Sequence, residues 1–152
     1  MDRRQSGSVG GKRADCLFCR IADGGMQAHV VAESAEGIAF LDHRPVFPGH
    51  CLIIPRAHAD TLADLPADAV GPYFLFVQRI ARAVESGLHA DGTFVAMNNK
   101  VSQSVPHLHV HIVPRRKKDG LRGFFWPRQK YENDEAAERT RDAIRDALPT
   151  SG

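Results

Sequence analysis

Three histidines at alternate positions constrain this chain more than any other feature. They are His107, His109 and His111, and single apolar residues separate them in the stretch HLHVHIV, residues 107–113. On a β-strand, residues i, i+2 and i+4 share one face. The spacing therefore predicts a strand with one imidazole face and one apolar face, and the apolar face is expected to pack against a helix.

The imidazole face has three interpretations. The first is a half-exposed strand whose polar residues are histidine by chance. The second is one metal ion bound by all three, but four residues at about 3.3 Å each separate the outer pair by roughly 13 Å, which argues against it. The third is chemical: one neutral imidazole, available near neutral pH, acts as a nucleophile while its neighbours orient it.

The rest of the chain predicts an α+β fold with an antiparallel sheet. Hydrophobic periodicity favours a long helix over residues 68–89, and a polar helix is expected at about 134–148. The sequence CLFCRIADG predicts a short helical turn. Apolar runs predict strands before and after the long helix, at residues 29–34, 37–42, 51–55 and 93–98. Strands and helices do not alternate in a βαβ rhythm, which favours antiparallel pairing.

Composition indicates the setting. A chain of 152 residues fits one domain, and a net charge of +2 gives no argument for a nucleic-acid or membrane partner. No apolar run is long enough to cross a bilayer, and the N-terminus lacks the apolar core of a signal peptide. The 3 cysteines do not form a disulfide framework, so we expect a cytoplasmic protein. Residues 1–14 are polar and expected to be disordered.

Several segments resemble the histidine-triad (HIT) superfamily of nucleotide hydrolases and transferases. They are CLFCRI, IAFLDHRPVFPGHCLIIPRAH and MNNKVSQSVPHLHVHIVPR, in the family's order within residues 16–115. The resemblance implies a HIT-like sheet of about five strands with one long helix, paired into a homodimer. It implies a domain core at 15–115, between the N-terminal extension and a C-terminal extension, 116–152, that contains the polar helix.

The resemblance also implies a reaction. His109 would attack the α-phosphate of a nucleotide and form a nucleotidyl-histidine, which water then hydrolyses. His111 would help hold the phosphate, and His50 matches an assisting histidine. Gln103 and Ser104 match positions that contact the α-phosphate and the leaving-group oxygen, where fixed donors lower the barrier.

The nucleoside pocket is assigned in the same way. Asp42 matches an acidic residue that binds the ribose hydroxyls, and Asn98 matches another nucleotide contact. Phe18, Ile21 and Phe40 match apolar positions around the base, although each is also a plain core candidate. A purine nucleotide, with adenosine as its nucleoside, is the expected substrate.

The pair Cys16 and Cys19 suggests a metal site. Two thiolates need two further ligands to close a tetrahedral Zn²⁺ site. The resemblance implies these ligands, because some members of the superfamily and the related galactose-1-phosphate uridylyltransferases close such a site with two histidines, which match His58 and His107 here. A thioredoxin-like redox pair and two incidental buried cysteines remain as alternatives, while Cys51 fits an apolar core.

Retention of His111 favours hydrolysis over the transferase and phosphorylase branches of the superfamily. A nucleotide-binding interaction protein with only incidental hydrolysis is the alternative from another class. One departure is Ser102, where the family often has glycine. The basic and aromatic stretch after Arg115, with Lys117 and Trp126, could contact a second phosphate or base, or form a partner-facing surface.

Overall fold

The computed structural model describes residues 13–121 and 128–149. The chain divides into two compact units, residues 1–119 and 120–152, which are treated separately below. The expected disordered segment 1–14 lies outside the described residues except for its last two positions, and Trp126 lies outside them as well.

One sheet of five strands forms the first unit, and every neighbouring pair in it is antiparallel. The strands are β1 (Val30–Glu33), β2 (Gly37–Leu41), β3 (Cys51–Pro55), β4 (Gly92–Ala96) and β5 (Val110–Arg115). Their order in the sheet is β1-β2-β3-β5-β4, so the histidine strand β5 is an interior strand that pairs with both β3 and β4. This confirms the α+β architecture expected from the sequence.

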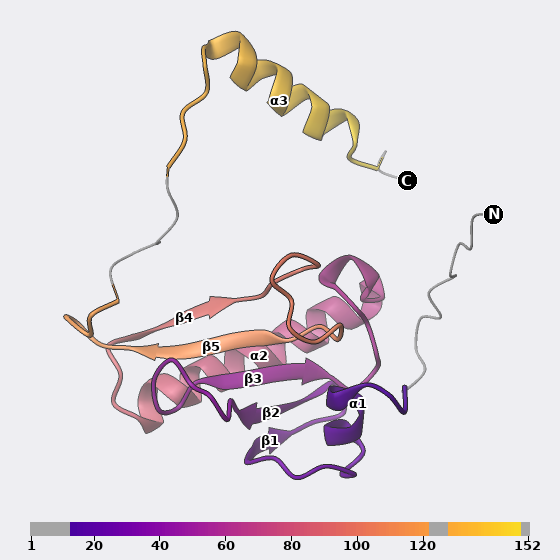
Figure 1. Cartoon of the computed structure of the whole chain (residues 1–152), viewed down its shortest axis with the longest axis vertical. Coiled ribbons are helices and arrows are strands. Elements are labelled where there is room, and N and C mark those ends of the chain that lie inside the picture. The colour runs from indigo at the N-terminus through magenta and orange to yellow at the C-terminus, as the bar shows by residue number, and fades with distance from the viewer. Residues whose placement is uncertain (1–12, 122–127, 150–152) are drawn as a thin grey trace. The chain divides into compact units, whose positions relative to one another are not determined.

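Helix α2 (Ala67–Gly87) covers one face of the sheet and lies behind it in Figure 1. Its buried side chains pack against the apolar residues that alternate with the histidines, Leu108, Val110 and Ile112. The buried Tyr73 hydroxyl donates a hydrogen bond of 2.7 Å to the Ile53 carbonyl and fastens the helix to β3. The predicted division into an apolar and an imidazole face is confirmed.

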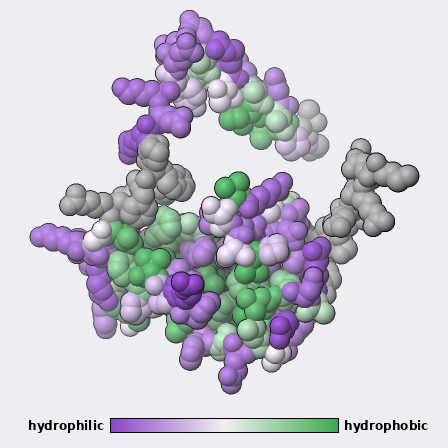
Figure 2. All heavy atoms as spheres, viewed as in Figure 1, coloured by the Kyte–Doolittle hydropathy of each residue, from purple (hydrophilic) through white to green (hydrophobic). Residues whose placement is uncertain are grey.

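The opposite face of the sheet packs against helix α1 (Leu17–Ala22). Neighbouring residues of a strand point to opposite faces, and here Leu52 and Ile54 contact α1 while Ile53 belongs to the core under α2. A second small core therefore forms around Phe18. Figure 2 shows this side of the first unit as hydrophobic patches divided by hydrophilic side chains.

The regular strand β5 begins at Val110, later than the histidine spacing predicts. His107 and His109 precede it, although they keep the alternation of sides. The His107 amide donates to the Val105 carbonyl at 2.8 Å, and the Leu108 amide donates to the Ala59 carbonyl at 2.7 Å. These bonds to loop segments replace the sheet ladder, which is why the strand starts three residues after His107.

The second unit contains helix α3 (Asp134–Asp146), which agrees with the polar helix expected near 134–148. The Asn133 side chain caps its first turn by accepting from the Ala136 amide at 2.8 Å. No residue of α3 is buried. In the described parts of the chain, none of the helices has the length and apolar character needed to cross a membrane.

Candidate active site

A cavity of about 640 Å³ opens on the side of the sheet that carries α1. Its walls come from α1, the loop before β1, the end of β2 and the segment that carries the histidines. The lining includes seven of the residues predicted for catalysis or nucleotide binding: Phe18, Ile21, Phe40, Asp42, Ser104, His109 and His111.

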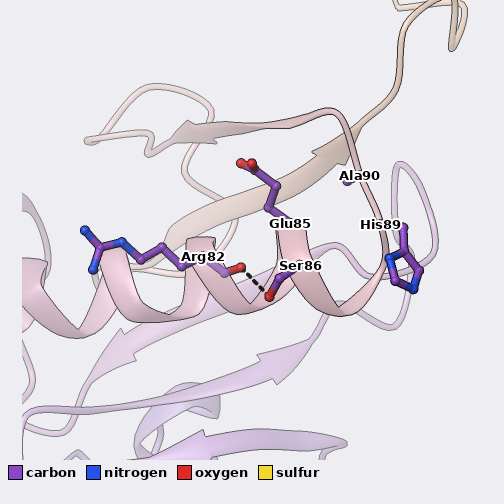
Figure 3. A pocket seen from close by; sticks show the side chains of 5 residues that line it. All are labelled: Arg82, Glu85, Ser86, His89 and Ala90. Atoms are coloured by element: carbon purple, nitrogen blue, oxygen red, sulfur yellow. Dashed lines mark hydrogen bonds between the residues drawn. The ribbon is translucent and has the colours of Figure 1, made fainter.

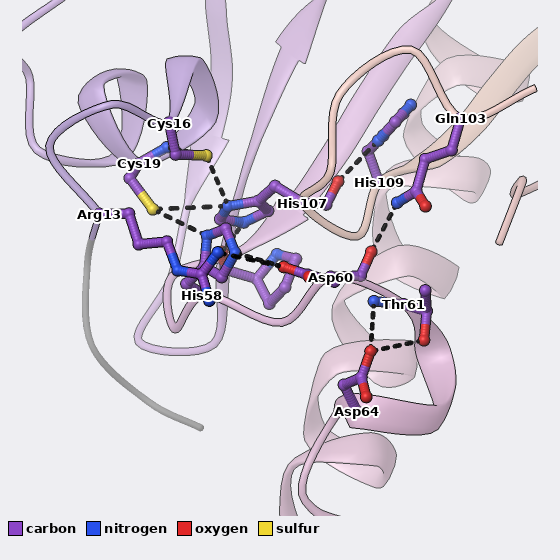
Figure 4. Close-up of polar contacts among 11 residues, drawn as sticks. Arg13, Cys16, Cys19, His58, Asp60, Thr61, Asp64, Gln103, His107 and His109 are labelled. Atoms are coloured by element: carbon purple, nitrogen blue, oxygen red, sulfur yellow. Dashed lines mark hydrogen bonds and ion pairs between the residues drawn. The ribbon is translucent and has the colours of Figure 1, made fainter. Parts of the chain in front are cut away.

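The orientation of the buried His109 ring is fixed by one backbone group. Its Nδ1 lies 2.8 Å from the His107 carbonyl oxygen, and Figure 4 draws this hydrogen bond as a dashed line. A carbonyl can only accept, so Nδ1 carries the proton and the lone pair of a neutral ring resides on Nε2. The edge-on ring of Phe18, 5.1 Å away between centroids, supports the imidazole at the cavity wall.

His50 and His111 form a directed hydrogen-bonded pair beside it. The Val46 amide donates to His50 Nδ1 at 3.2 Å, so the proton of the neutral His50 ring lies on Nε2. That nitrogen is 3.0 Å from His111 Nδ1 and donates to it. His111 therefore carries its own proton on Nε2, which is the nitrogen left to donate to a bound ligand.

Burial keeps this pair neutral. Burial lowers the pKa of His111 to about 4, with further lowering from His109 and His50, while the Asp42 carboxylate acts in the opposite direction. Burial also lowers the pKa of His50, again opposed by Asp42. Near neutral pH both rings are uncharged, so the hydrogen-bond directions described above apply.

Asp42 follows β2 and is well placed to accept hydrogen bonds in the cavity. Its Oδ1 already accepts from the Arg44 amide at 2.9 Å, and its Oδ2 lies 3.8 Å from His50 Nε2. Further into the cavity, the rings of Phe18 and Phe40 meet edge to face at 5.6 Å between centroids. The carboxylate and the aromatic walls thus provide polar and apolar parts of one pocket.

Two predicted nucleotide contacts lie outside the cavity lining. Asn98 is exposed. The Gln103 side chain is already hydrogen-bonded within the protein: its Nε2 donates to the Asp60 carbonyl at 2.5 Å, and its Oε1 accepts from the Lys100 amide of its own loop at 2.9 Å. In the structure, Gln103 therefore links the loop beside Ser104 to the segment at Asp60.

The loop before Ser104 has a strained backbone. Lys100 and Ser102 both adopt left-handed conformations, with φ of 68° and 59°. This region favours glycine because other residues place Cβ close to the backbone. The conformation gives a physical reason why glycine suits the position of Ser102.

Sequence reasoning missed several residues of the cavity. Met26, Gln27, His29 and His43 line it in addition to the predicted set. His43 could have been found because it directly follows Asp42. The loop residues 26–29 have no periodicity or motif that would have marked them.

The four residues predicted to bind a metal come together (Figure 4). Cys16, Cys19, His58 and His107 are all buried, and their ligand atoms lie within 4.8 Å of one another. The measured separations of sulfur and Nδ1 are 3.5 Å for Cys16 and His107, 3.2 Å for Cys19 and His58, and 3.6 Å for Cys19 and His107. Tetrahedral zinc with usual bond lengths requires about 3.6 Å between a sulfur and a nitrogen ligand.

The outer nitrogens of both histidines also suit a metal. His107 Nε2 donates to the Pro55 carbonyl at 2.9 Å, and His58 Nε2 donates to the Asp60 carboxylate at 2.6 Å. Each Nδ1 is therefore unprotonated and directed at the thiols, as metal ligation requires. A smaller hollow of about 260 Å³ beside the cluster is lined in part by Cys16 and His58.

A second cluster, Asp42, His50 and His111, also has ligand atoms within 4.8 Å. It fits a metal less well because the Val46 amide holds His50 Nδ1 as an acceptor. The facing nitrogen then carries the proton and is already donating to His111. The cysteine-containing cluster fits a metal better, because both of its histidines direct an unprotonated Nδ1 at the thiols.

Another hollow, of about 400 Å³, lies at the end of α2 and is lined by Arg82, Glu85, Ser86, His89 and Ala90 (Figure 3). The hydrogen bond drawn there runs within the helix, from the Ser86 hydroxyl to the Arg82 carbonyl at 3.0 Å. The arrangement shows no converging set of reactive groups.

Comparison with known proteins agrees with this fold and site. The family model for the HIT domain matches residues 24–118, and the chain belongs to the HIT family. A crystal structure of a HIT-family member from Bacillus subtilis superposes with a TM-score of 0.82 at 32% identity, covering 90% of this chain and 99% of that one.

Two further relatives bear on chemistry. The adenosine 5'-monophosphoramidase of Saccharomyces cerevisiae is 30% identical over 133 residues, which are 86% of this chain and 82% of the yeast protein. A zinc-bound histidine-triad protein from Mycobacterium smegmatis has a TM-score of 0.67 at 38% identity, covering 87% and 94% of the two chains. These likenesses support nucleotide hydrolysis in general terms and a metal-binding role for the four-residue cluster.

Proposed function

We propose that this protein hydrolyses an adenosine nucleotide derivative at its α-phosphate and releases AMP. The observation that carries the proposal is the His109 ring, whose Nδ1–H is held by the His107 carbonyl at 2.8 Å. The other ring nitrogen is then a neutral nucleophile at the wall of a cavity with aromatic and acidic groups. The yeast phosphoramidase relative supports the choice of an adenylyl substrate.

The reaction has two displacements. His109 Nε2 attacks the α-phosphorus, the bond from phosphorus to the leaving oxygen or nitrogen breaks, and the leaving group takes the electron pair of that bond and the proton of the Ser104 hydroxyl. Water then attacks the α-phosphorus, the phosphorus–nitrogen bond breaks with its electron pair returning to His109 Nε2, and one proton of the water restores the Ser104 hydroxyl as AMP departs. The covalent step divides one difficult displacement into two easier ones.

The neighbouring groups support the two displacements. His111 donates its Nε2 proton to a phosphate oxygen, and His50 keeps that tautomer in place through the 3.0 Å bond to His111 Nδ1. Ser104 supplies a hydroxyl to the leaving group, and Gln103 supports its loop.

The nucleoside is bound by a separate set of residues. Asp42 accepts from the ribose hydroxyls, and Phe18, Ile21 and Phe40 surround the purine. Asn98 retains its proposed contact at the outer edge of the nucleotide.

The metal of the four-residue cluster is proposed to be Zn²⁺, because two thiolates and two imidazoles are its usual structural ligands. When bound, it would fix the ends of α1 and of the segment that leads into β5. Metal analysis of protein purified without added metal is expected to find about one zinc per chain. Cys16→Ser should lower stability more than the turnover of each folded molecule, and a metal-free protein with unchanged melting would end this assignment.

The resemblance further supports a cytoplasmic homodimer with a core at residues 15–115. In the described sheet, β1 and β4 are the edge strands. Val95 on β4 is 45% exposed. An apolar edge of this kind is able to pair with a second copy through main-chain hydrogen bonds.

A substrate panel tests the proposed reaction. Adenylyl phosphoramidates, aminoacyl-adenylates and dinucleoside polyphosphates, with guanylyl controls, would be incubated with the protein and the products separated by chromatography. Release of AMP from at least one class, faster than from its guanylyl counterpart, is the expected result. Tight AMP binding with negligible turnover on every substrate would instead favour a nucleotide-binding interaction protein.

A further inference from the structure

Asp60 contacts two functional regions at once, one through its side chain and one through its backbone (Figure 4). Its carboxylate accepts the Nε2 proton of His58, in the metal cluster, at 2.6 Å. Its carbonyl oxygen accepts from the Gln103 side chain, in the loop beside the cavity, at 2.5 Å.

Side-chain hydrogen bonds hold the segment around Asp60 in a fixed position. Asp64 accepts from both the amide and the hydroxyl of Thr61, at 3.1 and 2.7 Å, and so fixes the turn that follows Asp60. The Leu62 amide donates to the Asn99 side chain at 2.8 Å. Residues 60–62 are therefore fastened to residues 99–103 at two points.

A carboxylate on the outer nitrogen of a metal-bound histidine has known physical effects. It fixes the tautomer and orientation of the ring and raises its basicity, and its loss typically costs 10–100-fold in metal affinity. The 2.6 Å contact of Asp60 and His58 has the length of a charge-assisted hydrogen bond. No comparable side chain serves His107, whose outer nitrogen uses the backbone carbonyl of Pro55.

We propose that Asp60 is a positioning residue that couples the metal cluster to the substrate loop. Metal binding fixes His58, His58 fixes Asp60 through the carboxylate, and the Asp60 carbonyl then sets the position of Gln103 and the loop that carries Ser104. The inference rests on the proposed metal and nucleotide roles, and it adds a defined route between them.

The first experiment measures metal affinity with Co²⁺, whose cysteine-to-cobalt absorption reports ligation, in competition with a chelator. Asp60→Asn should weaken Co²⁺ binding about 10–100-fold. Asp15→Asn is the matched control, because Asp15 lines the hollow beside Cys16 and its substitution also replaces one carboxylate by a neutral amide. It has no hydrogen bond or ion pair among the described residues, and it should change the affinity less than threefold.

Asp60→Glu, which keeps a carboxylate, should recover most of the lost affinity. The melting temperature of the metal-free Asp60→Asn protein should equal that of the metal-free wild type, which separates positioning from a general folding defect. Equal Co²⁺ affinities for Asp60→Asn and Asp15→Asn would overturn the proposed role of Asp60 and leave the metal assignment in place. A wild type without cysteine-to-cobalt absorption would overturn the metal assignment on which it rests.

The second experiment measures AMP binding by calorimetry to metal-loaded and metal-free protein. The loaded wild type should bind AMP at least about fivefold more tightly, and AMP should tighten Co²⁺ binding by the same factor, because coupling is reciprocal. In Gln103→Ala this ratio should approach one. An unchanged ratio in Gln103→Ala would show that the coupling does not pass through the Asp60 carbonyl.

Discussion

The reactivity of His109 depends on a single carbonyl oxygen. The bond from Nδ1 to the His107 carbonyl leaves Nε2 as the unprotonated nitrogen. His107 therefore serves two purposes, because its backbone orients the proposed nucleophile and its Nδ1 faces the thiols of the metal cluster. The alternating histidines are one motif with three separate environments.

Asp42 gives the first prediction at this scale. Asp42→Asn should weaken binding of AMP by tenfold to a hundredfold, since a hydrogen bond to a charged group contributes about 1.5–3 kcal/mol. Binding of 2′-deoxy-AMP should weaken less, because it lacks one of the two hydroxyls. Calorimetric titration of both ligands checks this, and equal weakening of the two would argue against a ribose role.

His111 gives a prediction about pH. Its folded pKa of about 4 lies below the unfolded value of 6.5, so the unfolded chain binds more protons between these two values. The stability that His111 contributes is therefore complete above about pH 6.5 and is lost as the pH falls toward 4. Relative to His111→Gln, the wild type should lose about 1–2 kcal/mol of unfolding free energy over that range, once solvent screening is allowed for.

Urea unfolding of both proteins at several pH values measures this difference. The comparison cancels the groups that both proteins share and that do not interact with His111, including those of the metal cluster. A difference in unfolding free energy that stays constant from pH 7 to pH 4 would show that His111 is not held neutral by burial.

The sequence predicted single residues well where a motif linked them. The four metal-cluster residues come together as the resemblance implied, because a Cys-x-x-Cys turn and the segments beside β3 and β5 meet at the same end of the sheet. Asp60 was not predicted, since its role depends on residues 60–62 meeting residues 99–103 in space. The sequence HADTL shows only that a carboxylate follows two positions after a histidine.

At the scale of the elements, one tight turn holds His50 against β5. Gly49 has a φ of 100°, and a Cβ at this position would meet the Leu88 side chain. The turn is closed by the His50 amide, which donates to the Phe47 carbonyl at 3.0 Å. This geometry gives a physical reason for glycine immediately before the assisting histidine.

Gly49→Ala should therefore cost about 1–3 kcal/mol of unfolding free energy and displace His50. Gly87→Ala is the matched control, because Gly87 is the last residue of α2 and a Cβ there meets no other atom within 4 Å. That change should stabilise the protein by about 0.5–1 kcal/mol. Urea unfolding of the two variants measures both effects, and a Gly49→Ala protein as stable as the wild type would contradict the strain described here.

Hydrophobic periodicity predicted which helices and strands form better than it predicted the residues at which they begin and end. The long helix was expected at 68–89 and forms at Ala67–Gly87, and the sheet has the five strands expected. The start of β5 was wrong by three residues, because Leu108 bonds to Ala59 and not to a neighbouring strand. That partner is distant in the sequence, so no local pattern could reveal it.

For the whole molecule, the exposed edge of the sheet leads to a prediction about assembly. Size-exclusion chromatography with light scattering should give twice the chain mass of 16.7 kDa. Val95→Lys places a charge on the β4 edge and should give monomers, while Val31→Lys on the opposite edge strand should remain dimeric. A dimer that survives Val95→Lys would move the interface away from β4.

The central claim is that His109 carries the nucleotide during turnover. Rapid quenching of the reaction with a radiolabelled adenylyl substrate is the most direct measurement, followed by peptide mapping of the protein-bound label. We predict an acid-labile, alkali-stable label on His109 in the wild type. His109→Ala should bind AMP but carry no label, with turnover lowered by at least about 10²–10⁴-fold. Near-normal turnover by His109→Ala would contradict the nucleotidyl-histidine mechanism.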